Sequence, residues 1–463
     1  MKKSHLLIAI AALVGAGLTS CGTGGGNDGK IKVTFWHTMG KSNQEKLDAM
    51  IATFNEKYPN IVIEHAAQGG YTDLEGKLLK AIPAKTTPTM AFCYADHVAG
   101  YGNNTLDLTP FVESQESDGA GGIVGLTAED KADYIAGYWN EGMQYTRQGL
   151  YSVPFSKSTE VLFYNKTFFD KHNLPVPTKW ESDDPNDLTA MWNLCKKIKE
   201  IDSNITPLGY DSDDNMYITL SAQYDIPYTS IKNGAGSFDF NNAEAKAMVT
   251  KIKEYYDAGY IVTKGTLPNN TYTSTKFKTQ ELLMSIGSTG GTSYNVPDRD
   301  GDGEFLFEAA VAPVPQQKAN AAGASKIISQ GPSICFFKNS KISEEQSRAA
   351  WLFYKHITNT ENSAAYSILT GYEPVRESSY QTEAYQAHLA APANPKDDTL
   401  FKVVARVTQQ PEVRGAYFSS PAFKGSSTAR QQVGGIISQV LLGSSTIDAA
   451  FANAMQECEI AAL

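Results

Sequence analysis

Apolar and polar positions recur along the chain with two periods, which predict strands and helices in alternation. Residues 31–36 form an apolar run of strand length, and the next segment carries apolar side chains at helical spacing until Pro59 ends it. Residues 61–64 and 89–94 predict two further strands, with a helix over residues 74–82 between them. This order is typical of a parallel sheet covered by helices. The N-terminal third therefore predicts an α/β fold.

The same alternation continues towards the C-terminus. Strands are predicted at 161–164 and 282–286, and helices at 192–201, 243–258, 343–357, 429–442 and 447–460. A length of 463 residues suggests two or three domains at about 150 residues each. No repeat of solenoid period interrupts the pattern. We therefore expect an α/β chain of two lobes.

The first twenty residues have the pattern of a signal peptide. Lys2 and Lys3 precede an apolar stretch, residues 6–14, that is shorter than the roughly 20 residues of a membrane-spanning helix. Residues 18–21, Leu-Thr-Ser-Cys, resemble the bacterial lipobox, which is cleaved before a cysteine that receives a diacylglycerol. The alternative, a cytoplasmic protein with an apolar N-terminal strand, is disfavoured by the glycine-rich segment that follows.

These features predict how the protein is located. Residues 1–20 would be removed, Cys21 would carry the lipid, and residues 21–30 would form a flexible tether. The remainder would be a soluble, extracytoplasmic domain anchored to the cell membrane, either facing the periplasm or at the cell surface. We expect it to be a monomer.

Charge and cysteine content exclude several partners. The chain has 40 Lys and Arg against 50 Asp and Glu, a net charge of −10, and no dense basic run, so we expect no nucleic-acid partner. Four cysteines follow Cys21, without the spacing of a zinc site. An even number permits pairing in an oxidising compartment, but we expect buried free thiols. They are Cys93, Cys195, Cys335 and Cys458.

Residues 153–166, with the sequence VPFSKSTEVLFYNK, resemble the interlobe segment of substrate-binding proteins of bacterial ABC importers. The segment is most similar to the branch of extracellular solute-binding protein family 1 that takes sugars and glycerol 3-phosphate. Other segments agree in the same order, and the resemblance runs from about residue 31 to residue 460. They are residues 34–37 (TFWH), 70–71 (GY), 284–288 (MSIGS) and 370–375 (TGYEPV).

The resemblance implies a two-lobed, periplasmic-binding-protein-like fold of type II, with one ligand in the cleft between interleaved lobes. It places crossings between the lobes near residues 156–160, 283–288 and 330–333. Lobe one would then comprise residues 31–157 and 286–331, and lobe two residues 158–285 and 332–463. The same resemblance implies no enzymatic activity and no cofactor.

Ligand-binding residues follow from the resemblance position by position. Hydroxyl groups and a carboxylate would bind ligand hydroxyls, and tyrosines would stack on the carbon skeleton. Trp36 is a further candidate because it follows the first strand, at the edge where open α/β sheets bind ligands; a place in the lobe core is the alternative. The implied residues are Tyr71, Asp96, Ser158, Ser288, Gly331 and Tyr372.

Two positions depart from the family pattern. Tyr417 stands where glycerol-3-phosphate binders have the arginine that meets the phosphate, and Arg414 is the nearby residue that could replace it. Asp214 and Tyr217 stand where paired tryptophans cover the ligand. Losing a phosphate-binding fork and gaining a carboxylate disfavours an anionic ligand. We expect a neutral or weakly charged sugar or polyol, or a glycerol-phosphate derivative.

Residues 298–304, with the sequence DRDGDGE, place carboxylates at alternate positions, as calcium loops do. The twelfth position of an EF-hand would fall on Ala309, so that pattern is not met. A structural calcium site and a solvated turn remain open. The candidate ligands are Asp298, Asp300, Asp302 and Glu304.

Three functions remain open from the sequence. The favoured one is a non-catalytic binding protein that closes on its ligand and delivers it to the transmembrane subunits of an ABC permease. A surface glycoside hydrolase would need two cleft carboxylates, of which only Asp96 has support. A sensor lipoprotein of the same fold is the third. The sequence contains no HExxH, GxSxG or GxxxxGK[ST] motif.

Overall fold

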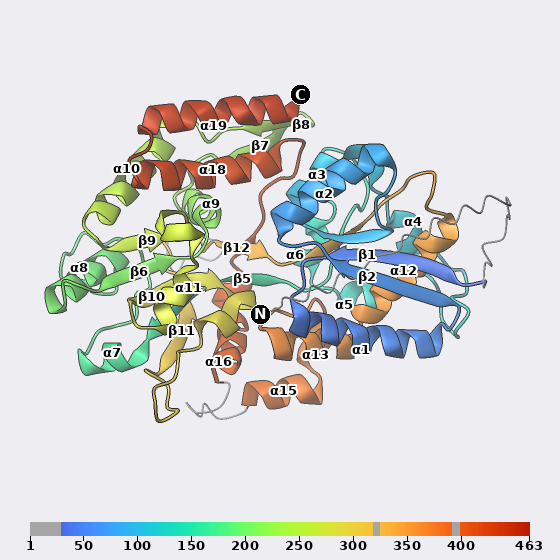
Figure 1. Cartoon of the computed structure of the whole chain (residues 1–463), viewed down its shortest axis with the longest axis horizontal. Coiled ribbons are helices and arrows are strands. Elements are labelled where there is room, and N and C mark those ends of the chain that lie inside the picture. The colour runs from blue at the N-terminus through green and yellow to red at the C-terminus, as the bar shows by residue number, and fades with distance from the viewer. Residues whose placement is uncertain (1–28, 318–324, 391–398) are drawn as a thin grey trace, which may run out of the picture.

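The computed structural model describes residues 29–317, 325–390 and 399–463. Two lobes lie side by side, each with its own sheet and its own hydrophobic core (Figure 1). The predicted signal peptide, Cys21 and residues 22–28 of the predicted tether lie outside the described residues, so the predictions made on them stay predictions.

The first lobe is built on a five-stranded sheet in the order β2-β1-β3-β13-β4. β1 runs parallel to β2 and β3, as the alternating pattern predicts, whereas β13 is antiparallel to β3 and β4. The strands are β1 (Ile31–His37), β2 (Ile61–Ala67), β3 (Met90–Cys93), β4 (Val153–Pro154) and β13 (Ser333–Phe336).

Helices cover both faces of this sheet (Figure 1). α1 buries Leu47, Met50 and Phe54, the apolar face expected from its helical spacing. The helices of this lobe are α1 (Lys41–Lys57), α2 (Tyr71–Ala84), α3 (Ala95–Tyr101), η1 (Gly102–Asn104), α4 (Thr109–Glu113), α5 (Ala128–Asp133), α6 (Ala136–Glu141), α12 (Glu344–Ile357), α13 (Thr360–Thr370), α14 (Glu377–Tyr380) and α15 (Glu383–Ala390).

The second lobe is built on a mixed sheet in the order β14-β12-β5-β10-β6-β9, with β11 also paired to β5. β5 is buried along almost its whole length, because strands lie on both sides of it and helices cover it. The strands of this lobe are β5 (Ser158–Asn165), β6 (Thr206–Tyr210), β9 (Ile261–Thr263), β10 (Leu282–Ser288), β11 (Ala309–Pro313), β12 (Ile327–Gln330) and β14 (Tyr417–Phe418), with a separate hairpin of β7 (Thr229–Lys232) and β8 (Ala235–Phe238).

α9, α18 and α19 pack together at the top of this lobe in Figure 1, and α18 also contacts α3 of the first lobe. The α9–α18 pair therefore faces the first lobe. The helices of the second lobe are α7 (Lys166–Lys171), α8 (Met191–Ile201), α9 (Asp213–Gln223), α10 (Ala243–Asp257), η2 (Lys264–Thr266), η3 (Pro268–Asn270), α11 (Thr273–Lys278), η4 (Thr289–Asn295), α16 (Thr399–Thr408), α17 (Pro411–Arg414), α18 (Ser426–Leu441) and α19 (Ile447–Ala462).

The lobes are interleaved, but one predicted crossing is wrong. The chain passes between the sheets from β4 to β5 and returns from β12 to β13, near two of the three predicted crossings. The predicted crossing at 283–288 does not exist, because β10 lies inside the second sheet between β5 and β6. Residues 286–331 therefore belong to the second lobe. β13, α12 and α13 belong to the first, contrary to the assignment of 332–463 to lobe two.

A third change of lobe falls between α15 and α16. Tyr385 of α15 packs in a cluster that contacts Ile135 of the first lobe, whereas Leu400 and Val404 of α16 pack with Val311 of β11. The segment 399–463 therefore lies in the second lobe, as expected from the sequence.

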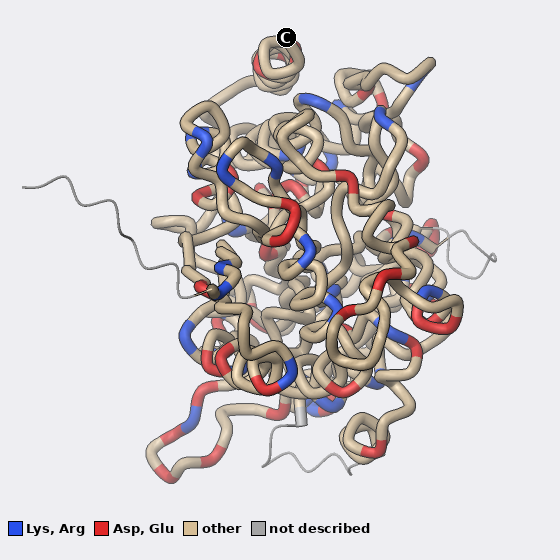
Figure 2. Tube along the Cα trace, turned by 90° about the vertical axis from the view of Figure 1, so that its right-hand side faces the viewer, with Lys and Arg blue, Asp and Glu red and all other residues tan. Residues whose placement is uncertain are grey.

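Cys93, Cys195, Cys335 and Cys458 are buried and free, which confirms the expected state of these thiols. Across the described ranges, no helix is long and apolar enough to span a bilayer. Figure 2 shows Lys and Arg interspersed with Asp and Glu along the described trace.

Candidate ligand-binding site

A cavity of about 460 Å³ lies between the lobes and is lined from both sides. Tyr71, Tyr94 and His97 line it from the first lobe, and Asp214 and Arg430 are among the lining residues from the second. A smaller hollow of about 50 Å³ adjoins it, sharing Tyr94 and Arg430 and adding Asp96. The carboxyl ends of β2 and β3 lead into this cleft, as expected for an open α/β sheet.

Tyrosines form the first-lobe wall of the cleft. The rings of Tyr71, the first residue of α2, and Tyr94, which follows β3, stack with centroids 4.3 Å apart and planes at 25°. Burial raises the pKa of both phenols, so both stay neutral hydrogen-bonding groups at physiological pH. The Tyr372 ring lies so close to Gly290 that a Cβ there would approach it to 2.6 Å. Such rings offer flat apolar faces with polar edges, which suit a polyhydroxylated ligand.

Arg430 of α18 is a cleft cation that sequence reasoning missed completely. Its Nε lies 2.7 Å from Asp214 Oδ2 in an ion pair, and its terminal nitrogen Nη2 donates to Asn215 Oδ1. Burial lowers the pKa of Arg430, but the carboxylates of Asp214 and Asp96 outweigh that effect and raise it above the usual value. The guanidinium is therefore charged and fixed in orientation.

A helical spacing in the sequence could have located this arginine. Ser427, Arg430, Gly434 and Ser438 all line the cleft, and their intervals of three and four residues place them on one face of α18. A small-residue stripe interrupted by a single arginine is a visible signal within the predicted helix at 429–442.

A buried carboxyl group supports the arginine from behind. Glu160 of β5 is 1% exposed and accepts hydrogen bonds from Tyr210 at 2.6 Å and Thr219 at 3.4 Å. Burial raises the pKa of Glu160 to about 7, partly offset by hydrogen bonds from Tyr210 and Asn215. Asn215 thus links Glu160 to Arg430, and this series of hydrogen bonds holds the guanidinium in place.

Acidic residues predominate in the cleft. Asp211 accepts from Thr273 N at 2.7 Å, and Asp213 accepts from Gly265 N at 2.8 Å, so both are held by the backbone of the second lobe. Burial raises the pKa of both carboxyls. Five acidic residues border the two cavities: Asp96, Glu141, Asp211, Asp213 and Asp214. The lysine and arginine residues there are Lys264 and Arg430, and the histidine is His97.

The family-derived residues divide into those at the cleft and those behind it. Tyr71 and Asp96 line the cleft, whereas Tyr372 packs against Gly290 and is not among the residues that line the two cavities. Ser288 accepts from the backbone of Gly290 at 3.2 Å, and Ser158 is buried in β5. Neither serine is among the cavity-lining residues. Ligand contact by any of these side chains stays a prediction.

Three further residues that the sequence predicts as ligand-binding lie away from the cleft cavities. Tyr217 is wrong as a cleft residue, because it is completely buried in the second core and donates to Phe240 O at 3.3 Å. Trp36 of β1 packs against the first core, the alternative foreseen for it. Arg414 lies outside the lining of both cleft cavities and pairs with Glu377 at 2.8 Å, so the structure offers no support for its replacing the phosphate-binding arginine.

Tyr417 and Gly331 belong to a buried polar network where the lobes join. Tyr417 donates to Glu373, and Lys157 Nζ binds Glu141 and donates to Gly331 O at 3.3 Å. Burial raises the pKa of Glu373 to about 7, partly offset by hydrogen bonds from Tyr417 and Tyr138. The aligned tyrosine thus ties the lobes together and does not border the cleft cavities.

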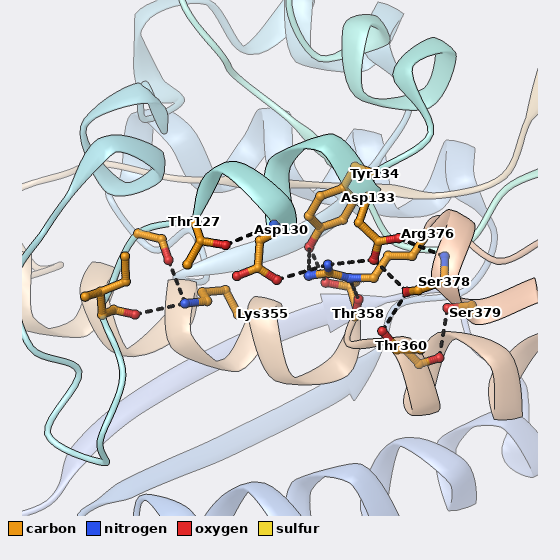
Figure 3. A network of polar contacts seen from close by, with 12 residues as sticks. Thr127, Asp130, Asp133, Tyr134, Lys355, Thr358, Thr360, Arg376, Ser378 and Ser379 are labelled. Carbon is orange, nitrogen blue, oxygen red and sulfur yellow. Dashed lines mark hydrogen bonds and ion pairs between the residues drawn. The ribbon is translucent and has the colours of Figure 1, made fainter. Parts of the chain in front are cut away.

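A second network holds the segment that carries Tyr372 and Glu373. Arg376 has a side chain only 5% exposed and binds Asp130 at 3.2 Å and Asp133 at 3.1 Å, both on or next to α5 (Figure 3). Its Nε donates to Thr358 O at 2.6 Å. This network fixes residues 370–378 against the rest of the first lobe.

The predicted calcium loop is folded around its own backbone. Asp300 accepts from the N–H groups of Asp302 and Glu304, each at 3.0 Å, and Asp298 pairs with Lys278 at 3.1 Å. Within the described ranges, no three His, Cys, Asp or Glu side chains gather into a group that could hold a metal ion. The structure therefore does not bring these carboxylates together.

Residues 49–393 match the family model for bacterial extracellular solute-binding proteins. The chain belongs to this family. This result confirms the resemblance carried by residues 153–166, and the family consists of binding proteins rather than enzymes.

Known solute-binding proteins resemble the chain over most of its length. The sn-glycerol-3-phosphate-binding periplasmic protein UgpB of Escherichia coli is 23% identical over 396 residues, covering 83% of this chain and 82% of its own. The structure of Mycobacterium tuberculosis UgpB with glycerophosphocholine has a TM-score of 0.69 at 18% identity, covering 93% of this chain and 98% of its own. The GacH receptor of Streptomyces glaucescens, solved unliganded and with acarbose, has a TM-score of 0.69 at 17% identity, covering 94% and 98%. These structures establish the two-lobed fold.

Proposed function

We propose that this solute-binding protein captures a neutral sugar or polyol between its lobes and delivers it to the transmembrane subunits of an ABC importer. The observation that carries the ligand class is the charge of the cleft, where five carboxyl groups face two cations. A phosphate dianion would be placed among carboxylates in a partly desolvated space, where charges interact strongly. A neutral ligand has no such penalty, and its hydroxyls can both donate and accept.

Capture would proceed by closure of the lobes. Tyr71, Tyr94 and Asp96 come from one lobe and Asp214 and Arg430 from the other, so a ligand between them gains contacts from both only when the cleft is closed. A ligand shifts a conformational equilibrium by its difference in affinity for the two states. Contacts from both lobes provide that difference and present a closed form to the permease.

A glycerol-phosphate ligand is the alternative, favoured by the similarity to UgpB. Isothermal titration of sn-glycerol 3-phosphate, against D-glucose, maltose, myo-inositol and glycerol, separates the two. We expect micromolar binding of a neutral compound and none of the phosphate ester. Micromolar binding of glycerol 3-phosphate, with no neutral compound bound, would overturn the neutral-ligand proposal.

Hydrolysis of glycosides is the rival activity. The sequence supports one cleft carboxylate, whereas the structure places several there, so the lack of a second acid no longer argues against it. Asp214 is engaged by Arg430, and Asp211 and Asp213 by backbone N–H groups, so three of them are committed to the protein itself. Incubation with p-nitrophenyl glycosides decides the question: we expect no nitrophenol, and its steady release would establish an enzyme.

We also propose that the mature protein is a monomer anchored through a lipid on Cys21, on the periplasmic face or the cell surface. The lipobox-like residues 18–21 and the glycine-rich segment after them support this. Metabolic labelling with radioactive palmitate should mark the wild type and leave the Cys21→Ser variant unlabelled. Equal labelling of both would contradict the assignment.

A further inference from the structure

Arg430 has part of its hydrogen-bonding capacity left over. Its Nε and one terminal nitrogen are bound by Asp214 and Asn215 of α9, while its second terminal nitrogen, Nη1, has no hydrogen bond to any described residue. The side chain remains 24% exposed, in the wall of both cleft cavities. Two donors on a fixed guanidinium are therefore available to a ligand.

Asp96 borders the smaller of those cavities from the opposite lobe. The one hydrogen bond it receives within the described part of the chain comes from the His97 backbone N–H, at 3.0 Å to Oδ1. Its Oδ2 is left as an acceptor. Asp96 and Arg430 line the same small cavity, and the Asp96 carboxylate contributes to raising the pKa of Arg430.

We propose that Arg430 and Asp96 form a cross-lobe pair that determines specificity by recognising two neighbouring hydroxyl groups of the ligand. One hydroxyl donates to the Asp96 carboxylate, and the oxygen of the next accepts from Arg430 Nη1. This inference rests on the proposed function, and it names the residues and the ligand group that would account for it.

The pairing explains why an arginine in this cleft suits a neutral ligand. A lone arginine would attract phosphate, but Asp214 holds this one at 2.7 Å and Asp96 lies opposite. An incoming phosphate would have to approach both carboxylates to reach the guanidinium. A pair of hydroxyls satisfies the free acceptor and the free donor together without adding charge.

Asp96 and Arg430 should also affect the position of the lobes in the ligand-free protein. Opposite charges on the two lobes attract, and in a narrow cleft solvent screens them less than on an open surface. Asp96 and Arg430 therefore bias the empty protein towards the closed arrangement. Removing either charge should open the cleft.

The first experiment measures this bias in the ligand-free protein. Spin labels at positions 80 of α2 and 251 of α10, both exposed, report the distance between the lobes by double electron–electron resonance. We expect Arg430→Gln and Asp96→Asn each to raise the open population at least twofold, and the double variant to add little more. Lys196→Gln, which removes one charge from an exposed position on α8, should leave the distribution unchanged. Distributions like the wild type in both cleft variants would overturn the cross-lobe pair, whatever ligand the protein binds.

The second experiment tests recognition with D-glucose, maltose, myo-inositol and glycerol as neutral probes, and sn-glycerol 3-phosphate and inorganic phosphate as anionic ones. For the neutral probe that binds wild type, we expect Arg430→Gln and Asp96→Asn each to weaken binding ten- to a hundredfold, and the analogue lacking one of two adjacent hydroxyls to lose as much. Affinity within twofold of wild type in Arg430→Gln would overturn the specificity role. Binding of glycerol 3-phosphate that Arg430→Gln abolishes would make Arg430 a phosphate anchor instead. If only the anions bind, the proposed function fails, while the distance measurement still decides the cross-lobe pair.

Discussion

Tyr417 of the second lobe donates its phenolic hydrogen bond to the carboxylate of Glu373 in the first, with 2.9 Å to each oxygen. Tyr138 donates to the same carboxylate at 3.0 Å, and the two tyrosine rings stack 6.0 Å apart. A single buried carboxyl group thus joins elements of both lobes. Its protonation state should affect stability.

We predict that Glu373 makes the folded protein less stable as pH rises. Burial raises its pKa from 4.5 to about 7, so between these values the native protein holds a proton that the unfolded chain has released. The contribution of this group to stability therefore falls by about 3 kcal/mol from pH 4.5 to pH 7, and then stays constant. Urea denaturation of wild type and Glu373→Gln at pH 5 and pH 8 measures this contribution, as the difference in unfolding free energy between the two proteins.

From pH 5 to pH 8, the free energy of unfolding of Glu373→Gln should rise by a few kcal/mol relative to that of wild type, because glutamine has no charge to bury. Glu160→Gln is the matched comparison, since Glu160 is equally buried and its pKa is also raised to about 7. It should show a difference of the same sign. An unchanged difference between Glu373→Gln and wild type at the two pH values would show that Glu373 is ionised in the native state throughout.

A second prediction concerns Gly331, where the chain returns from the second lobe to the first. Its φ is +88°, and a Cβ there would lie 2.5 Å from Ser156 O and 2.7 Å from Lys157 Cα. Both crossing segments would have to separate, so Gly331→Ala should cost about 3 kcal/mol of stability and hinder lobe closure. Gly100→Ala on α3 is the control, because its Cβ would meet nothing within 4 Å. A melting temperature for Gly331→Ala equal to that of the control would contradict this account.

Local patterns in the sequence predicted part of the elements, but no strand was predicted at β6 and no helix at α9. Family segments sufficed for two lobes with a cleft. The predicted helices at 243–258 and 343–357 correspond to Ala243–Asp257 and Glu344–Ile357. The first buries one stripe at helical spacing, whereas the second is buried on most of its sides. The assignment of residues to lobes failed at β10. A buried strand has the same apolar sequence pattern in either sheet, and only the pairing of β10 with β5 and β6 shows to which sheet it belongs.

The site was harder to predict because side-chain partners are set by tertiary contacts. Tyr217 and Tyr71 look alike in sequence, yet one fills a core and the other borders the cleft. Arg430 matched no family position, and its role depends on Asp214 and Asn215, more than two hundred residues earlier in the chain. Position-by-position transfer cannot reveal a residue that the reference pattern lacks.

A third prediction concerns calcium. The loop at 298–304 uses Asp300 to accept its own backbone N–H groups and Asp298 to bind Lys278, so its carboxylates are not poised to share an ion. We expect the melting temperature in excess EDTA to stay within about 1 °C of that in millimolar calcium, since no site is lost. A fall of several degrees in EDTA, reversed by calcium and absent in Asp302→Asn, would show instead that an ion reorganises this loop.

The last prediction concerns Arg376, which Figure 3 shows between α5 and the segment after α13. Replacing it with Gln would leave Asp130 and Asp133 without their cation and Thr358 O without its donor at 2.6 Å. Breaking a buried ion pair by removing one partner costs about 3–5 kcal/mol, and the partial exposure of both aspartates places the expected loss near 3 kcal/mol. Because the segment also carries Tyr372 and Glu373, ligand affinity should fall together with stability, as titration and urea denaturation would measure. Arg299→Gln, in the exposed loop at 298–304, should change neither quantity. A stable Arg376→Gln protein with wild-type affinity would show that the aspartates hold the segment without the arginine.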